Sequence, residues 1–295
     1  MKRICFLLII LFSHFSLLRS QLIYEISGNG AKDKSYLLAT NRLVDIQFLD
    51  TIPNLFQYFG RCNKVINEFA MQDYEAIQAL RQAALLPDSV ILANFYTDTE
   101  YRDMDQSLKL TLKMGWDKLC RMKPSYLTEM YRTELFRQWL DFNEERSMEA
   151  FFEIVAQEKN MPIYGLDNVG ETMYMLFDRE PFFHQCKDLK HVIDYPEQEV
   201  RQERNLCAMY RNGLLNDIVY LVTGPDNTSS LSYSDYQVYA QRNLSWVKRL
   251  APYLQEGKAF ITLNCIYLGG EKGLLAQLRA AGYKVKPANK ARTNK

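Results

Sequence analysis

The segment 258–287 constrains the fold more than any other part of the chain, because it predicts a strand, a turn, a helix and a second strand in succession. Residues 260–267 are apolar and bounded by glycines, and the run is too short for a helix. A double-glycine turn follows, and Gly282 stands where the next helix ends. The apolar side chains of that helix recur at helical spacing: Leu274, Leu275, Leu278 and Ala281. In such a unit ligands bind where the first strand ends, which points to residues 264–271.

The remainder of the chain predicts an α/β protein with a small central β-sheet flanked by helices. Alternating segments on both sides of residues 28–34 predict an N-terminal hairpin. Two short apolar strands end on carboxylates, at Glu68 and at Asp167. Helical patterns dominate residues 98–160, which we interpret as a helical insertion in the middle of the chain. Since no internal repeat or low-complexity linker interrupts the pattern, we expect a single domain over residues 21–287.

The first 20 residues predict a secretory signal peptide. Lys2 and Arg3 precede a nearly apolar run over residues 4–18, and a cleavage point follows near Ser20 and Gln21. The alternative is a retained membrane anchor, but this apolar run is shorter than the ~20 residues that a spanning helix needs. We therefore expect an exported protein, periplasmic or secreted, with no transmembrane segment after the signal peptide.

The charge balance argues against nucleic acid as a partner. The leader holds three of the 36 basic residues, so 33 basic residues face 35 acidic ones in the mature chain. A nearly neutral protein without a basic block lacks the electrostatic signature of nucleic-acid binding. The basic residues at 288–295 are interpreted as a solvated, flexible tail.

The cysteines and histidines offer few sites for covalent or metal chemistry. Five cysteines follow the leader without any CxxC pair, which argues against a disulfide scaffold or a zinc ribbon, and their pairing stays open: Cys62, Cys120, Cys186, Cys207 and Cys265. His184, Cys186 and His191 lack the spacing of a tetrahedral metal site. The apolar neighbours of Cys265 favour a buried, inert thiol over a nucleophile.

Polar residues at strand ends and on one helix are the remaining candidates: Glu68, Asp167, Asn243 and Asn264. Carboxylates that converge at the ends of neighbouring strands are typical of hard-metal or acid–base sites. The alternative is that these side chains cap helices and turns.

Several motifs occur in the order that characterises one family. Residues 35–42 follow the first hairpin strand in place of a G-T-x-H motif, and a strand ending in Glu68 comes next. Residues 165–167 match a G-L-E motif, and residues 242–246, RNLSW, match R-N-x-x-W. The closing block, residues 264–285, matches a G-A-x-H-L strand end, a glycine turn and A-G-Y-x-V. Over nearly the whole mature chain the sequence resembles the TraB/GumN family, whose relatives include the Tiki metalloproteases and, more distantly, ChaN-like and erythromycin-esterase-like proteins.

The resemblance implies a divalent metal, but the positions of its ligands have changed. The two motif histidines fall on Arg42 and Tyr267, and the G-L-E carboxylate is shortened to Asp167. Because arginine cannot ligate a cation, we expect no metal cofactor. Our hypothesis is that Arg42 supplies to Glu68 and Asp167 the positive charge that a metal would give.

The resulting prediction is a degenerate, non-catalytic family member with a binding or structural role. The expected binding residues share one cleft, where a small anionic or polar ligand is possible: Asn41, Arg42, Arg242, Asn243 and Asn264. The alternative is a hydrolase, peptidase- or esterase-like, with residual activity through Glu68 and Asp167 and with Tyr267 as a further catalytic candidate. A third possibility, a partner-binding protein with a sealed cleft, predicts no pocket near these residues.

Overall fold

The computed structural model describes residues 21–70, 74–140, 147–223 and 233–288. The expected signal peptide and all but the first residue of the expected basic tail lie outside these ranges. Within them, no helix combines the length and the apolar character that crossing a membrane requires.

One mixed sheet of six strands forms the centre of the described chain, in the order β4-β3-β5-β2-β1-β6. Its strands are β1 (Ile23–Ser27), β2 (Ser35–Thr40), β3 (Lys64–Asn67), β4 (Ile163–Gly165), β5 (Ala259–Asn264) and β6 (Lys284–Pro287). Strand β1 is antiparallel to both of its neighbours, β2 and β6. The other pairs are parallel, so β2, β5, β3 and β4 all end at one edge of the sheet. The predicted α/β class and the predicted N-terminal hairpin are confirmed.

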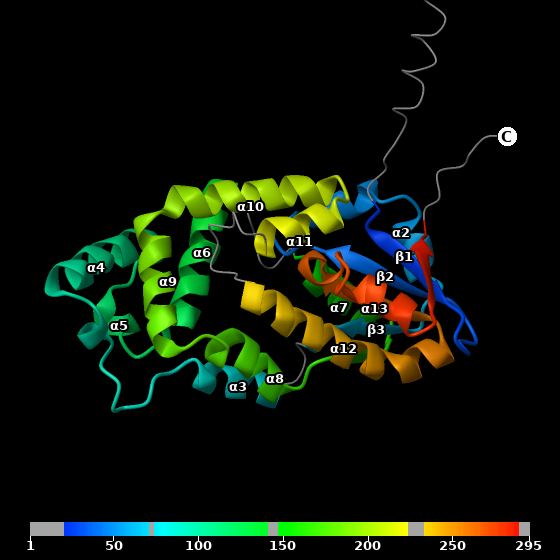
Figure 1. Cartoon of the computed structure of the whole chain (residues 1–295), viewed down its shortest axis with the longest axis horizontal. Helices are drawn as coiled ribbons and strands as arrows, with labels where there is room; N and C mark the ends of the chain where they lie inside the picture. Colours follow the sequence, from blue (N-terminus) through cyan, green and yellow to red (C-terminus); the bar gives the residue numbers. More distant parts are fainter. Residues whose placement is uncertain (1–20, 71–73, 141–146, 224–232, 289–295) are drawn as a thin grey trace, which may run out of the picture.

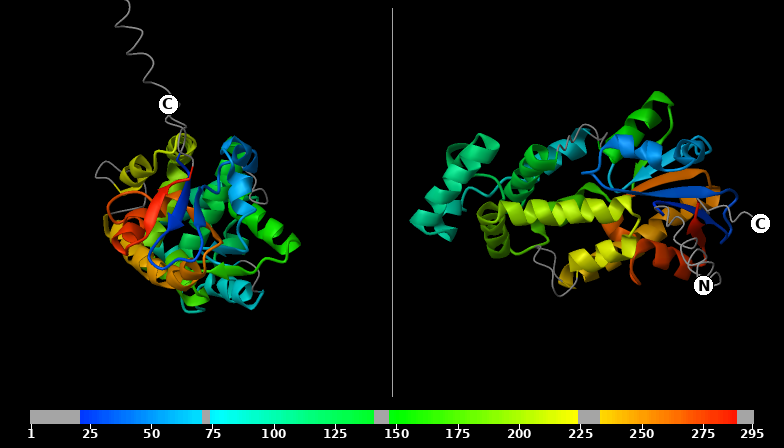
Figure 2. Two further views of the ribbon diagram at one scale, coloured as in Figure 1. Left: turned by 90° about the vertical axis from the view of Figure 1, so that its right-hand side faces the viewer. Right: turned by 90° about the horizontal axis from the view of Figure 1, so that it is seen from above.

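Helices cover both faces of this sheet (Figure 2). Helices α2 (Leu55–Phe59) and α7 (Met148–Glu158) lie on one face, while α12 (Tyr233–Glu256) and α13 (Leu274–Ala280) lie on the other. Every residue of β2 and β3 is buried, as expected for parallel strands with helices on both sides. Three aromatic rings join α2, α7 and β5, with centroids 4.8–5.3 Å apart: Phe59, Phe152 and Phe260.

Further helices extend beyond the carboxyl ends of the parallel strands (Figure 1). They are α3 (Tyr74–Ala83), α4 (Asp98–Leu112), α5 (Trp116–Leu119), α6 (Pro124–Leu140), α8 (Val169–Met173), the π-helical turn η4 (Tyr174–Asp178), α9 (Phe182–Asp194), α10 (Pro196–Arg211) and α11 (Leu215–Thr223). Short 3₁₀ turns complete the order: η1 (Ile46–Thr51), η2 (Leu92–Phe95) and η5 (Cys265–Tyr267). Helix α6 packs against α4, α9 and α10, which makes a helical wall opposite the strand ends.

The closing unit has the predicted order, but its first strand is shorter than expected. Strand β5 ends at Asn264, and the next three residues turn into η5. The cause is local: the Asn264 side chain accepts a hydrogen bond from the backbone N–H of Ile266 at 3.1 Å, which competes with the strand ladder. Tyr267 therefore lies on a turn and not at the end of a strand.

Candidate ligand-binding cleft

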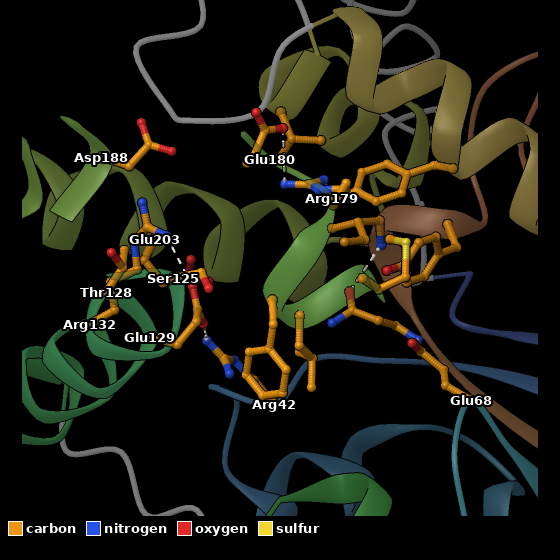
Figure 3. A pocket seen from close by; sticks show the side chains of 18 of the residues that line it. Arg42, Glu68, Ser125, Thr128, Glu129, Arg132, Arg179, Glu180, Asp188 and Glu203 are labelled. Atoms are coloured by element: carbon orange, nitrogen blue, oxygen red, sulfur yellow. Dashed lines mark hydrogen bonds and ion pairs between the residues drawn. The ribbon is translucent and has the colours of Figure 1, made fainter. Parts of the chain in front are cut away.

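A cavity of about 500 Å³ opens where the parallel strands end, between the sheet edge and the helical wall (Figure 3). Six of the eight residues that the sequence predicts for a site line it: Asn41, Arg42, Glu68, Arg242, Asn264 and Tyr267. Asp167 and Asn243 are also buried, but they lie behind the lining. Parallel strands with a common carboxyl edge bring these distant segments together, as in other open α/β sheets. We call the part around Glu68, Asp167, Arg242 and Tyr267 the strand end of the cleft.

Arg242 on α12 is the centre of the strand end. Its Nε and Nη2 atoms donate to Asp167 Oδ2 at 2.8 and 2.5 Å, and Nη2 lies 3.3 Å from Glu68 Oε2. The guanidinium also makes cation–π contacts with two rings, 4.3 Å from the Trp246 centroid and 4.7 Å from the Tyr267 centroid. Burial disfavours the charge of Arg242, but Tyr267, Glu68 and Asp167 outweigh it and raise its pKa.

Asp167 is an anchor for α12. Trp246 Nε1 donates to Asp167 Oδ1 at 2.5 Å, and the backbone N–H of Asp167 donates to the Glu68 carbonyl at 2.8 Å. Arg242 and Trp246 reach the same carboxylate because residues four apart share a helix face. With its side chain 3% exposed, Asp167 has both oxygens engaged. The spacing within the RNLSW motif therefore serves to hold one buried carboxylate.

Glu68 is the carboxylate of the strand end that faces the cavity. Its Oε1 atom accepts a hydrogen bond from the backbone N–H of Asn264 at 2.9 Å. Burial raises the pKa of Glu68, while Arg242 and the Asn264 N–H act in the opposite direction. Glu68 is thus held in place by one backbone donor and one guanidinium.

The three predicted asparagines shape the loops around the cleft. Asn41 Oδ1 accepts from the Leu43 N–H at 2.8 Å, and Asn264 Oδ1 caps η5. Asn243 Nδ2 donates to the carbonyls of Tyr267 and Lys272 at 2.9 and 3.3 Å. Asn243 therefore fixes the turn that carries Tyr267. A direct role of these amides in ligand binding stays a prediction.

Arg42 has a different partner from the one our sequence hypothesis assigned. Its Nη2 atom donates to Glu129 Oε2 on α6 at 2.9 Å. The positive charge beside Glu68 and Asp167 comes from Arg242 instead. The hypothesis is wrong in this respect. Helix α6 places the Glu129 carboxylate next to Arg42 at the end of β2, and α12 places Arg242 between Glu68 and Asp167. Neither contact can be inferred from the spacing of residues in the sequence.

Sequence reasoning missed the opposite side of the cavity, which we call the helical end. It consists of charged side chains on α6, α9 and α10: Glu129, Arg132, Asp188, Glu199 and Glu203. Arg132 donates to Glu129 at 3.0 Å and to Glu199 at 2.9 Å. Burial opposes ionisation of Glu129, but Arg42 and Arg132 lower its pKa to about 2. The available signal was spacing, because Glu129 and Arg132 are three apart and Glu199 and Glu203 four apart on their helices.

The other candidates lie apart from the cleft. His184 is exposed and lies 3.8 Å from Glu180, and the His191 ring packs at a tilt against the Tyr195 ring, with ring centroids 4.9 Å apart. Neither histidine lines the cavity. Burial raises the pKa of the Cys265 thiol well above its usual value, as expected for an inert thiol. Across the described ranges, no three His, Cys, Asp or Glu side chains form a group that could hold a metal ion.

The donors at the strand end also fit a divalent cation poorly. The oxygens of Glu68 and Asp167 already accept N–H groups, and the Arg242 guanidinium lies between the two carboxylates. A cation placed there would face a fixed positive charge. At the two positions where the resemblance implies histidine ligands, the cleft presents a guanidinium and a phenol.

Together, the fold and the cleft define an α/β protein with a ligand-sized cavity at the carboxyl edge of a mixed sheet. Residues 22–287 match the model of the TraB/PrgY/gumN family, and the chain therefore belongs to this family. Comparisons with curated proteins and with solved structures find no match.

Proposed function

We propose that this protein is an exported, non-catalytic member of the TraB/PrgY/gumN family that binds a small polar molecule in its cleft. The observation that carries the proposal is that the carboxylates of Glu68 and Asp167 are both paired with Arg242. Within the described ranges no third His, Cys, Asp or Glu side chain joins these two carboxylates in a group that could hold a metal ion. Arg42 and Tyr267, at the positions of the motif histidines, add no metal donor of the usual kind.

The cavity favours a binding role over a purely structural one. A sealed cleft would leave no space near these residues, whereas a volume of about 500 Å³ is typical of small-molecule sites. The alternative, a hydrolase acting through Glu68, has one supporting observation, because burial raises the pKa of Glu68 as in many acid–base residues. Against it, Arg242 and a backbone N–H engage that carboxylate.

Export rests on the N-terminal pattern alone, with cleavage expected near Ser20 and Gln21. Mass spectrometry of the protein secreted from cells would give the mature N-terminus. A mature chain that still carries residues 1–20 would contradict export by this route.

The experiment that tests the non-catalytic assignment is metal analysis of the purified mature protein beside an Arg42→His/Tyr267→His double variant. We expect substoichiometric manganese and zinc in the natural protein and a gain of metal in the double variant, because two imidazoles would then join Glu68. An Arg42→Gln/Tyr267→Phe variant is the matched control, since it removes the same groups without adding ligands. Stoichiometric metal in the natural protein would overturn the proposal.

A further inference from the structure

Acidic side chains outnumber basic ones around the cavity. Among the described residues that line it, four are arginines: Arg42, Arg132, Arg179 and Arg242. Six are carboxylates: Glu68, Glu129, Glu180, Asp188, Glu199 and Glu203. The lining therefore has an excess of two negative charges, and Asp167 behind it adds a third. An anionic ligand, which the sequence suggested on the basis of Arg42, would enter a site of its own sign.

The arginines are already engaged with other carboxylates. Arg42 and Arg132 pair with Glu129 and Glu199, and Arg242 pairs with Glu68 and Asp167. Arg179 lies 3.8 Å from Glu180. Two lining carboxylates, Asp188 and Glu203, have no ion pair within the described part of the chain, and Glu203 accepts a long contact from the Cys207 thiol at 3.9 Å.

Tyr267 gives a second, independent indication of a ligand at the opposite end. It is only 7% exposed, yet it lines the cavity. Its ring packs edge-on against Tyr239 and Trp246, with centroids 5.0 Å apart in both cases. Among the described residues its hydroxyl makes no hydrogen bond, and the hydroxyl oxygen is not one of the fully buried polar atoms, so it is open to the cavity.

Between these two ends the walls are partly apolar, beside the charged side chains of Arg42, Arg179 and Glu180 (Figure 3). The aliphatic, methionine and phenylalanine residues of the lining are Phe69, Phe136, Met175, Leu176, Phe177, Leu206, Val222 and Ile266. Figure 3 places Asp188 and Glu203 at one end of the cavity and Glu68 at the other. The cavity thus offers, in order, two carboxylates without an ion pair among the described residues, a partly apolar middle, and a phenol whose hydroxyl makes no hydrogen bond within the same ranges.

We propose that the cleft binds a small organic amine, with an apolar body and an ammonium group that pairs with Glu203 and Asp188. This inference rests on the proposed binding function and names its ligand class. An ammonium group supplies three donors and a positive charge, whereas the one arginine of the helical end, Arg132, is already paired with Glu129 and Glu199. The hydroxyl of Tyr267 supplies a hydrogen bond to a polar group at the far end of the same ligand.

The electrostatics of the empty cleft agree with this assignment. Burial raises the pKa of Glu203 to about 7, against the smaller opposite effect of Arg42 and Arg132. Burial also raises the pKa of Asp188. Both carboxylates are desolvated without full compensation, so a cation that pairs with them gains more than it would at an exposed acid.

The test uses three probes of one shape, 4-phenylbutylamine, 4-phenylbutanol and 4-phenylbutyrate, titrated calorimetrically into the purified mature protein near pH 8. We expect the amine to bind at least tenfold more tightly than the alcohol, and the carboxylate to bind more weakly than both. Equal affinities, or tighter binding of the carboxylate, would overturn the proposal. So would the absence of binding by all three probes.

Two variants locate the interaction. Glu203→Gln and Asp188→Asn are each expected to weaken the amine at least tenfold and to leave the alcohol unchanged. Glu197→Gln removes a charge from an exposed position on the same helix and should leave both affinities unchanged. If Glu203→Gln and Asp188→Asn both bind the amine as tightly as the natural protein, the assignment fails. Metal analysis distinguishes the failure of one proposal from the failure of the other. Stoichiometric metal in the natural protein would overturn the non-catalytic function, whether or not the amine binds. Failure of a metal-free protein to bind the amine would overturn only this inference.

Discussion

At the strand end of the cleft each buried carboxylate has a nitrogen donor, whereas at the helical end Asp188 and Glu203 have none among the described residues. The strand end is built around Arg242, which pairs with Glu68 and Asp167 and makes cation–π contacts with two rings. The helical end has Arg132 on Glu129 and Glu199, and its remaining acids face the cavity.

This difference indicates at which end of the cleft a charged ligand would gain the most binding free energy. A buried ion pair with all its hydrogen bonds made is costly to disturb and has little to gain from a ligand. A desolvated carboxylate without a partner gains when a cation arrives. We therefore regard the strand end as the structural part of the cleft and the helical end as the part that selects the ligand. The variants below test this division.

Asp167→Asn is expected to have the largest effect. It leaves Arg242 buried with only Glu68 as a full charge partner, and breaking one side of a buried pair typically costs about 3–5 kcal/mol. Urea unfolding followed by circular dichroism measures the loss. Asp88→Asn is the control, because it removes the carboxylate of an ion pair whose Asp side chain is fully exposed. A loss below about 1 kcal/mol for Asp167→Asn would show that the strand end is not held by this pair.

The sequence could predict much of the strand end because it follows from topology. Parallel strands end at one edge, so residues just after β2, β3 and β5 had to meet there. The RNLSW spacing also indicated that Arg242 and Trp246 share a helix face. What could not be predicted was which guanidinium reaches which acid, because that depends on side-chain direction across the cleft.

Arg132→Gln and Arg42→Gln compare the two arginines that pair with the acids of the helical end. They test whether the stability of the folded protein depends more on the buried Arg132 than on Arg42, which follows β2. Arg132 and Glu199 are 15% and 8% exposed, whereas Arg42 and Glu129 are each 42% exposed. We expect a loss of about 2–3 kcal/mol for Arg132→Gln and less than about 1 kcal/mol for Arg42→Gln, since solvent screens the outer pair. Both are measured by the same unfolding titration. Equal losses would mean that Arg42 has a structural role as large as that of Arg132.

The helical end itself was beyond sequence reasoning. Arg42 and Glu129 are 87 residues apart, and no periodic pattern encodes a contact between a strand end and a helix so distant in the chain. Acids on amphipathic helices such as Glu199 and Glu203 are ordinarily interpreted as a solvated face. That Glu199 is buried and Glu203 half-buried follows only from the way α6, α9 and α10 pack around the cavity.

Glu203→Gln is expected to stabilise the protein at high pH. The folded chain retains the Glu203 proton up to about pH 7, whereas the unfolded chain releases it near the usual value of 4.5. The free energy of unfolding therefore falls as the pH rises from about 4.5 to 7, and glutamine removes this dependence. At pH 8 we expect a gain of about 2 kcal/mol, and at pH 4 almost none. Thermal unfolding between pH 4 and pH 8 measures this difference in stability between the variant and the natural protein, with Glu197→Gln as the control. A loss of stability at pH 8 would mean that Glu203 has a partner in the folded protein.

Tyr267→Phe should have the smallest effect on stability, although Tyr267 is among the most buried residues of the cleft. Its ring contacts with Arg242, Trp246 and Tyr239 survive the change, and its hydroxyl has no partner in the described structure. The free energy of unfolding is therefore expected to change by less than about 0.5 kcal/mol. Tyr239→Phe is the matched control, because the Tyr239 hydroxyl accepts a hydrogen bond from Arg179 at 3.2 Å, and its removal should cost about 1 kcal/mol. If the two variants lose equal stability, the Tyr267 hydroxyl belongs to the folded structure and is not available to a ligand. If only Tyr239→Phe is destabilised, the Tyr267 hydroxyl is a polar group that faces the cavity and that the fold does not use, and this is the property expected of a ligand contact.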